Sequence, residues 1–165
     1  MMAPEALLRM LAPGTPRFGA YRNGVLQIHI TRACDRACFN CTQGSNLRGK
    51  TYFISLEDFE LACKSLAGYW GVVGIFGGSP TLHPQFPAIC EIFRRYFPDI
   101  QQRGLWTNNL HGHGAVCRQT FYPRHSNLNV HLDRAAYDEF RRDWPESIVF
   151  GLNEDSRHSP PWVAM

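Results

Sequence analysis

The stretch Val25-Leu-Gln-Ile-His-Ile-Thr31 and the loop that follows it, Cys34-Asp-Arg-Ala-Cys-Phe-Asn-Cys41, decide how the rest of the chain is interpreted. In the first segment the apolar residues Leu26, Ile28 and Ile30 alternate with polar ones, which predicts a β-strand. The second segment places three cysteines within eight residues. Because thiolates this close in sequence can converge on one metal centre, we expect a metal site at the end of the first strand.

The composition is that of an ordinary globular domain and excludes several classes of protein. The 165 residues are 44% hydrophobic and 19% charged, with a net charge of +3. No apolar run has the roughly 18 residues that a membrane span needs, and the N-terminus does not resemble a signal peptide. No dense basic run predicts nucleic-acid binding. We therefore expect a cytoplasmic protein with neither a membrane nor a specific nucleic-acid partner.

The other cysteines have different interpretations. Cys63 and Cys90 each share a predicted helical face with large apolar side chains, so we expect both in the core. Cys117 lies near His111 and His113, which leaves a second metal site as an alternative. An ordinary polar loop is the favoured interpretation of that segment, because such clusters are often incidental.

Strands and helices are predicted to alternate along the chain. Strands are expected at 25–31, 72–76, 105–107, 128–133 and 148–152, and helices at 55–70, 84–97 and 134–144, with a weak helix or loop at 111–123. This order predicts βα units and a parallel sheet. Residues 1–17 are expected to form a leader with an accessory helix, and 18–165 one core domain that is incomplete at its C-terminus. A β-hairpin is predicted at 18–31, around Asn23-Gly24.

Two of the strands carry a further signal. Residues 25–31 and 128–133 both alternate apolar and polar side chains, whereas parallel strands buried on both faces are usually continuous apolar runs. We expect one face of the sheet to lie under helices and the other to line a polar cavity. The predicted fold class is α/β, a partial (βα) barrel of the TIM-barrel type with parallel strands.

Four segments together resemble the radical S-adenosylmethionine (SAM) enzyme family. The first is Cys34-x3-Cys38-x2-Cys41 after the first strand. Gly77-Gly-Ser-Pro-Thr-Leu-His-Pro84 is similar to the family's Gly-Gly-Glu-Pro segment. Trp106-Thr-Asn-Asn109 is similar to its Thr-Asn-Gly, and Val130-His-Leu-Asp133 to its Ser-Leu-Asp. The resemblance covers roughly residues 18–155 and implies six βα units, five of which are visible in this sequence.

The resemblance implies a chemistry and a set of cofactors. Cys34, Cys38 and Cys41 would bind three irons of a [4Fe–4S] cluster, and SAM would chelate the fourth iron. The reduced cluster would cleave SAM to a 5′-deoxyadenosyl radical, which abstracts hydrogen from a substrate. The implied partners are that unknown substrate and an electron donor such as flavodoxin or ferredoxin.

The resemblance also implies cofactor-binding residues, and no catalytic side chain is assigned. The cofactor-binding residues are Phe39, Asn40, Gly77, Gly78, Ser79, Pro80, Asn108, His131 and Asp133. Ser79 stands where the family has glutamate, and its neutral hydroxyl cannot make the same charge-assisted bond to the SAM ammonium. Asn40 stands where the family often has an aromatic residue.

Two other functions compete with the enzyme. One is a noncatalytic module in which the three cysteines hold zinc or an iron–sulfur cluster. The other is a structural or interaction domain whose cysteines are incidental. The Gly77–Pro84 segment and the polar-lined strands favour the enzyme, because neither alternative requires them.

Overall fold

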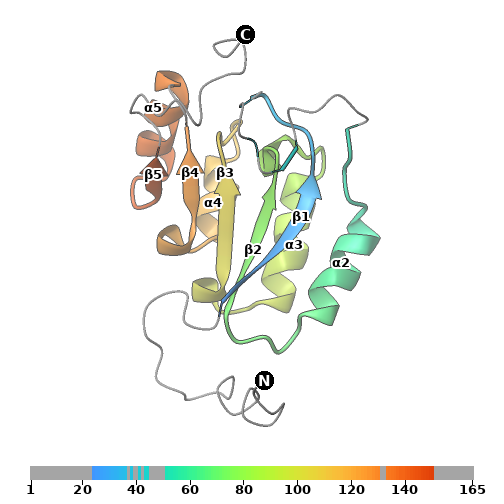
Figure 1. Cartoon of the computed structure of the whole chain (residues 1–165). Helices are drawn as coiled ribbons and strands as arrows, with labels where there is room; N and C mark the ends of the chain where they lie inside the picture. Colours follow the sequence, from blue (N-terminus) through green and yellow to red (C-terminus); the bar gives the residue numbers. More distant parts are fainter. Residues whose placement is uncertain are drawn as a thin grey trace, which may run out of the picture.

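A computed structural model describes residues 24–36, 38, 41, 43–44, 51–130 and 133–150 (Figure 1). Several sequence-based expectations lie outside these residues. They are the leader at 1–17, the first half of the hairpin at 18–23, the cofactor residues Phe39, Asn40 and His131, and the end of the chain at 151–165.

Five parallel strands form one sheet in the order in which they occur along the chain. They are β1 (Val25–Thr31), β2 (Val72–Gly77), β3 (Arg103–Thr107), β4 (Asn127–Asn129) and β5 (Ile148–Phe150). The predicted α/β class with parallel strands is confirmed. Among the described strands, β1 pairs with β2 alone and β5 with β4 alone, so this part of the chain forms an open sheet and not a closed barrel.

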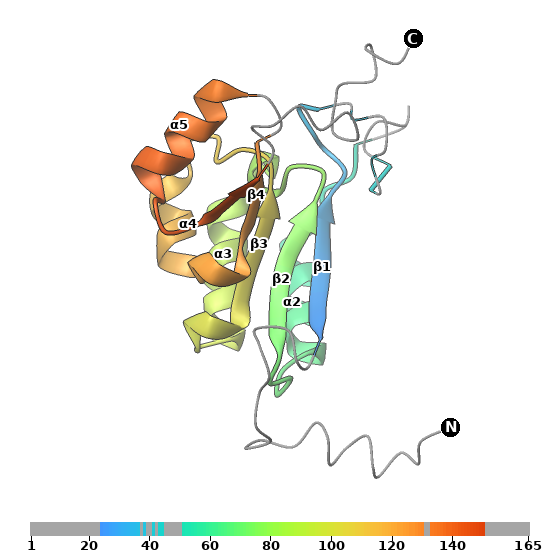
Figure 2. The same cartoon turned by 60° about the vertical axis from the view of Figure 1, so that its left-hand side comes forward.

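The α-helices cover one face of the sheet (Figures 1 and 2). They are α2 (Leu56–Ser65), α3 (Phe86–Tyr96), α4 (Gly114–Thr120) and α5 (Arg134–Asp143), and short 3-10 turns η1 (Pro80–Leu82), η2 (Ile100–Gln102) and η3 (Pro123–His125) lie between the longer elements. Parallel strands in sequential order with crossovers of one hand place every helix on the same side. Within the described ranges, no helix has the length and apolarity needed to cross a membrane.

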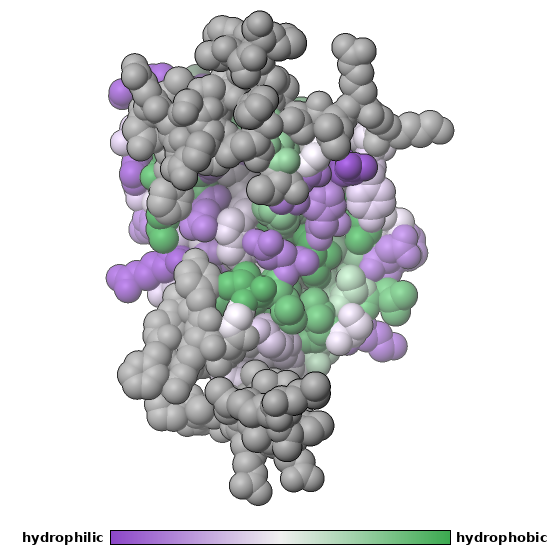
Figure 3. Space-filling model, viewed as in Figure 1, coloured by the Kyte–Doolittle hydropathy of each residue, from purple (hydrophilic) through white to green (hydrophobic). Residues whose placement is uncertain are grey.

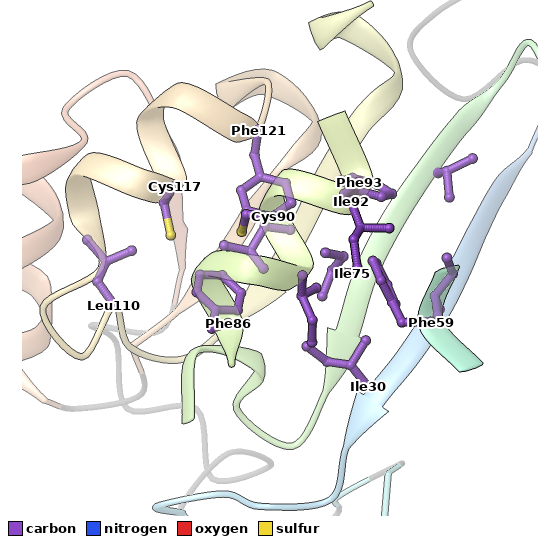
Figure 4. Close-up of a cluster of buried hydrophobic side chains, with 14 of the residues drawn as sticks. Ile30, Phe59, Ile75, Phe86, Cys90, Ile92, Phe93, Leu110, Cys117 and Phe121 are labelled. Atoms are coloured by element: carbon purple, nitrogen blue, oxygen red, sulfur yellow. The ribbon is translucent and has the colours of Figure 1, made fainter. Parts of the chain in front are cut away.

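The hydrophobic core lies between the sheet and this helix layer (Figure 4). Phe59, Cys63 and Cys90 are fully buried there, which confirms the core assignment of both cysteines. Cys117 is also fully buried, on α4, and burial raises its pKa well above that of an ordinary thiol. The polar-loop interpretation was therefore wrong for Cys117, although the turn at 111–112 precedes the helix and the expected weak helix within 111–123 is present as α4. A helix of two turns places this cysteine on its inner face, against the core.

The end of α2 differs from its prediction. Ser55 caps the helix as expected, because its hydroxyl oxygen accepts a hydrogen bond from the backbone N–H three residues on, at 3.0 Å. The helix ends at Ser65 rather than at residue 70, and Gly68 follows it with a positive φ of 88°. Leu66 and Tyr69 still pack against the core from the turn, so the apolar periodicity continues after the helix has ended.

Within the part of the chain that the structure describes, the opposite face of the sheet carries no α-helix, and it is the face seen in Figure 3. Strand register places the side chains of Gln27, His29, Phe76, Trp106, Asn127 and Asn129 on this face. Hydrophilic residues gather in the middle of the view, above a hydrophobic group. The Trp106 ring lies over Gly74, where an added Cβ would come within 2.6 Å of its Cε3 atom. The helix-free face is therefore polar with aromatic side chains, and two glycines, Gly74 and Gly104, make room for the indole.

Candidate functional site

The cysteine loop leaves β1 at the carboxyl edge of the sheet, where α/β folds commonly place their sites. Thr31, the last residue of the strand, fixes the start of the loop. Its hydroxyl oxygen accepts a hydrogen bond from the Ala33 N–H at 2.9 Å and donates to the Tyr52 carbonyl at 2.7 Å. Within the loop, the N–H of Cys41 donates to the carbonyl of Cys38 at 3.3 Å. This turn brings the second and third cysteines close together in space.

The three loop thiols influence one another electrostatically. Burial is the largest effect on Cys34, whose pKa is raised to about 11. The charges of Asp35, Cys38 and Cys41 also raise this pKa, whereas a hydrogen bond from the Arg36 backbone N–H lowers it. Burial, followed by the charge of Cys41, also raises the pKa of Cys38. Thiolates that repel one another in this way are stabilised by a cation between them. The chemistry of this donor set therefore fits iron or zinc.

Among the described residues, no three or more His, Cys, Asp or Glu side chains are gathered closely enough to hold a metal ion. All three loop cysteines belong to the described residues and are half-buried. Binding a metal on all three thiols requires the loop to draw them together.

The segment Gly77–Pro80 lies directly against the start of the cysteine loop. The N–H of Gly78 donates to the Thr31 carbonyl at 2.9 Å, and the N–H of Ser79 to the Ala33 carbonyl at 2.7 Å. A Cβ added at Gly77 would lie 3.2 Å from the Thr31 nitrogen and closer still to its carbonyl oxygen. The approach of two backbones is thus a sufficient reason for glycine at position 77, independent of any ligand.

Ser79 and Pro80 are both buried, and the Ser79 hydroxyl faces neighbouring threonines. Ser79 Oγ lies 3.5 Å from Thr81 Oγ1 and 3.4 Å from Thr107 Oγ1, and the two threonine oxygens are 3.4 Å apart. Pro80 opens the 3-10 turn η1 at its first position. Ser79 therefore places a neutral hydroxyl among two buried threonine hydroxyls, at the position where the radical SAM motif has a charged glutamate.

Asn108, which follows β3, contacts the cysteine loop. Its side-chain N–H donates to the Asp35 carboxylate, and His111 Nε2 lies 3.3 Å from the same carboxylate. Burial raises the pKa of Asp35, but the hydrogen bonds of His111 and Asn108 outweigh it and lower that pKa to about 2. The other amide atom, Asn108 Oδ1, is buried and has no hydrogen-bond partner among the described residues. It is an acceptor to which a bound molecule could donate.

Asp133 reaches the cysteine loop from the other side. The expectation of a strand to residue 133 was wrong, because β4 ends at Asn129 and Asp133 is the N-cap of α5. Its carboxylate accepts a hydrogen bond from the Ala136 N–H at 3.0 Å and forms an ion pair with Arg36. The pKa of Asp133 is lowered, mainly by the hydrogen bond from the Ala136 N–H and further by Arg36.

The structure thus gathers most of the sequence-predicted residues at one edge. The described members are the three loop cysteines, the segment Gly77–Pro80, Asn108 and Asp133. Sequence reasoning missed the contacts made by Asp35, Arg36 and His111. The signal that could have found them is two adjacent, opposite charges between the first and second cysteines of the loop.

Comparison with known proteins bears on the fold alone. No protein-family model matches the chain, and no curated protein matches it. The solved structure of BtrN in complex with AdoMet and 2-DOIA matches with a TM-score of 0.58 at 15% sequence identity. The match covers 76% of this chain and 55% of BtrN, so the chain spans about half the length of that structure. AdoMet is SAM, and at this identity the likeness to BtrN shows a shared fold and nothing further.

Proposed function

We propose that this chain is the core of a radical SAM enzyme, with a [4Fe–4S] cluster on Cys34, Cys38 and Cys41. The observation that carries the proposal is the meeting of the cysteine loop with the Gly77–Pro80 segment at the carboxyl edge of a parallel sheet. Four motifs in the family's order and a fold like that of an AdoMet-bound protein support it. No alternative function requires that combination.

The roles of the residues follow from their positions. The three thiols would hold the cluster, which when bound would supply the electron that cleaves SAM to a 5′-deoxyadenosyl radical. Asn108 would bind SAM through its unpartnered Oδ1, which can accept from an ammonium or a ribose hydroxyl. The radical would abstract hydrogen from a substrate held against the helix-free face. A small donor such as flavodoxin or ferredoxin would supply the electron.

A second candidate function is a metal-binding module that does not use SAM. Ser79 favours it, because the charged partner of the SAM ammonium is absent and the serine hydroxyl faces Thr81 and Thr107. In this function the three cysteines would hold zinc or an iron–sulfur cluster, with no SAM on the open iron.

Anaerobic reconstitution with iron and sulfide tests the proposal. The wild-type protein is assayed for iron and sulfide, and its reduced form is studied by electron paramagnetic resonance with and without SAM. Cys38→Ala is the ligand variant. Cys63→Ala is the matched control, because Cys63 is a fully buried core thiol. We expect Cys38→Ala to lose the cluster and Cys63→Ala to keep it.

The resonance spectra separate the two functions. A [4Fe–4S] signal that changes when SAM is added supports the radical enzyme. A cluster signal that is indifferent to SAM, or bound zinc in place of iron, supports the second candidate. Full iron loading of Cys38→Ala would show that the ligand assignment is wrong.

A further inference from the structure

The cysteine loop carries an acidic and a basic residue at adjacent positions, and their side chains contact residues that follow different strands. Asp35 bonds Asn108 and His111, which follow β3, whereas Arg36 pairs with Asp133 at the start of α5. Both contacts join residues far apart in the sequence, 73 or more positions for Asp35 and 97 for Arg36. The loop after β1 is thereby tied across the carboxyl ends of β3 and β4.

The partners of Asp35 are themselves held in place. The Thr81 hydroxyl oxygen lies 2.7 Å from His111 Nδ1, on the ring edge away from the carboxylate. The backbone N–H of His111 donates to the Asn109 side chain at 3.1 Å. His111 has a φ of 48°, a left-handed conformation that non-glycine residues rarely adopt. Strained backbone of this kind persists where the surrounding contacts over-determine it, and here those contacts aim the imidazole at Asp35.

The Arg36 contact has the same character. Asp133 already serves as the N-cap of α5, so its carboxylate is fixed before it meets the guanidinium. The side chains of both partners are mostly buried, at 22% and 28% exposure, so solvent screens the pair less than it screens a surface pair. In contrast, the pair of Arg134 with Asp138 on the same helix is largely exposed.

From this geometry we infer that Asp35 and Arg36 are positioning residues that anchor the cysteine loop on the ends of β3 and β4. The inference rests on the proposed function for its purpose, which is to hold the loop where its thiols can take up the cluster. Without the two anchors, the loop would lose the long-range links that Asp35 and Arg36 make to that edge. Its cysteines would then have to be ordered when the irons bind, which would weaken metal retention.

Matched substitutions separate anchoring from general stability. Asp133→Asn keeps an N-cap side chain for α5 but removes the charge that pairs with Arg36. Asp35→Asn removes the second anchor, and Arg36→Lys retains the charge that Arg36→Gln loses. Asp138→Asn is the control, because it removes a carboxylate from the same helix and breaks only an exposed pair.

The primary measurement is the rate of amide hydrogen exchange in the metal-free protein. Mass spectrometry measures it on peptides spanning residues 32–44, and the rates are corrected for the intrinsic exchange of each sequence. Loss of either anchor is expected to speed exchange in this peptide roughly fivefold, the factor for losing a charged contact of this exposure. Peptides from β2 and α3 should keep their wild-type rates. The second measurement is the half-time of iron loss from the reconstituted protein to a chelator, which we expect to shorten by a similar factor.

The outcomes are separable from those of the proposed function. Faster loop exchange in Asp133→Asn, Asp35→Asn and Arg36→Gln, with near-wild-type rates in Arg36→Lys and Asp138→Asn, supports the anchoring. Unchanged loop exchange overturns it, as does equal acceleration in β2 and α3, which would indicate general destabilisation. A wild-type protein that takes up no iron overturns the proposed function, while the exchange rates still decide the anchoring.

Discussion

Gly77→Ala distinguishes two reasons for glycine at the end of β2. If Gly77 serves only the approach of SAM, as the radical SAM motif implies, the substitution leaves the ligand-free protein unaffected. If the contact with β1 requires glycine, the ligand-free protein is destabilised. In the structure an added Cβ would lie 3.2 Å from the Thr31 nitrogen and nearer still to its carbonyl oxygen. Both atoms are backbone in a paired strand, so no side-chain rotation can relieve the contact.

The magnitude follows from two opposing effects. Forcing an extra methyl group into packed structure costs about 1–3 kcal/mol. Replacing glycine by alanine also restricts the unfolded chain, which offsets about 0.4–1 kcal/mol where the backbone is compatible. The backbone at Gly77 is compatible, because its φ is not among the positive values. We therefore expect a net loss of about 1–2 kcal/mol in the free energy of unfolding.

Urea unfolding of the metal-free protein, prepared without SAM, measures this loss. A chain of this size should also melt about 2–8 °C lower. Because the contact joins β2 to the start of the cysteine loop, iron loading should fall as well. Wild-type stability in the ligand-free variant, combined with lost SAM binding, would refute the backbone argument and restore the ligand as the reason for Gly77.

Three further predictions concern the sheet and its buried polar groups. Gly74→Ala should lower the free energy of unfolding by about 1–3 kcal/mol, because the new Cβ meets the Trp106 ring. Most of that loss should disappear when the same substitution is made in a Trp106→Ala protein. Urea unfolding of the protein with and without Gly74→Ala, in each background, measures both effects. Arg103→Met should lower the free energy of unfolding by about 3–5 kcal/mol. The buried guanidinium donates to three backbone carbonyls at 2.5 to 3.2 Å, and the substitution removes all three hydrogen bonds. A loss below about 1 kcal/mol in urea unfolding would contradict this. Burial lowers the pKa of His83 in the folded state, so the unfolded state protonates first as the pH falls through about 6.5. Stability should therefore decline in that window, and His83→Gln should remove part of the decline in urea midpoints measured from pH 5 to 7.

Strand positions were predictable where the pattern is local. The bounds of β1 agree with prediction, because alternation there coincides with burial of Ile28 and Ile30 against the helix layer. The fourth strand was predicted too long, because its alternation continues toward Asp133 although strand pairing stops at Asn129. Pairing depends on the neighbouring strand, and β5 follows only after an intervening helix, so nothing local in the sequence marks where it ends.

The candidate site was predictable as a place but not as a set of contacts. Strand order alone places the cysteine loop, the Gly77–Pro80 segment and Asn108 at one edge, since the carboxyl ends of parallel strands lie together. The partner of Asn108 could not be predicted, because the conformation of the cysteine loop decides which side chain reaches it. Asn108 is expected to bind a cofactor, and its side-chain N–H donates to Asp35 while its buried Oδ1 has no hydrogen-bond partner among the described residues.

The anchors and the thiols of the cysteine loop act in opposite directions. Asp35 and Arg36 hold the loop over the sheet edge, but their links do not bring the cysteines into a three-ligand group. Ionised thiols oppose that convergence, because negative charge on Cys38 and Cys41 adds to burial in raising the pKa of Cys34. A metal ion offsets the repulsion and supplies the attraction that the metal-free chain lacks.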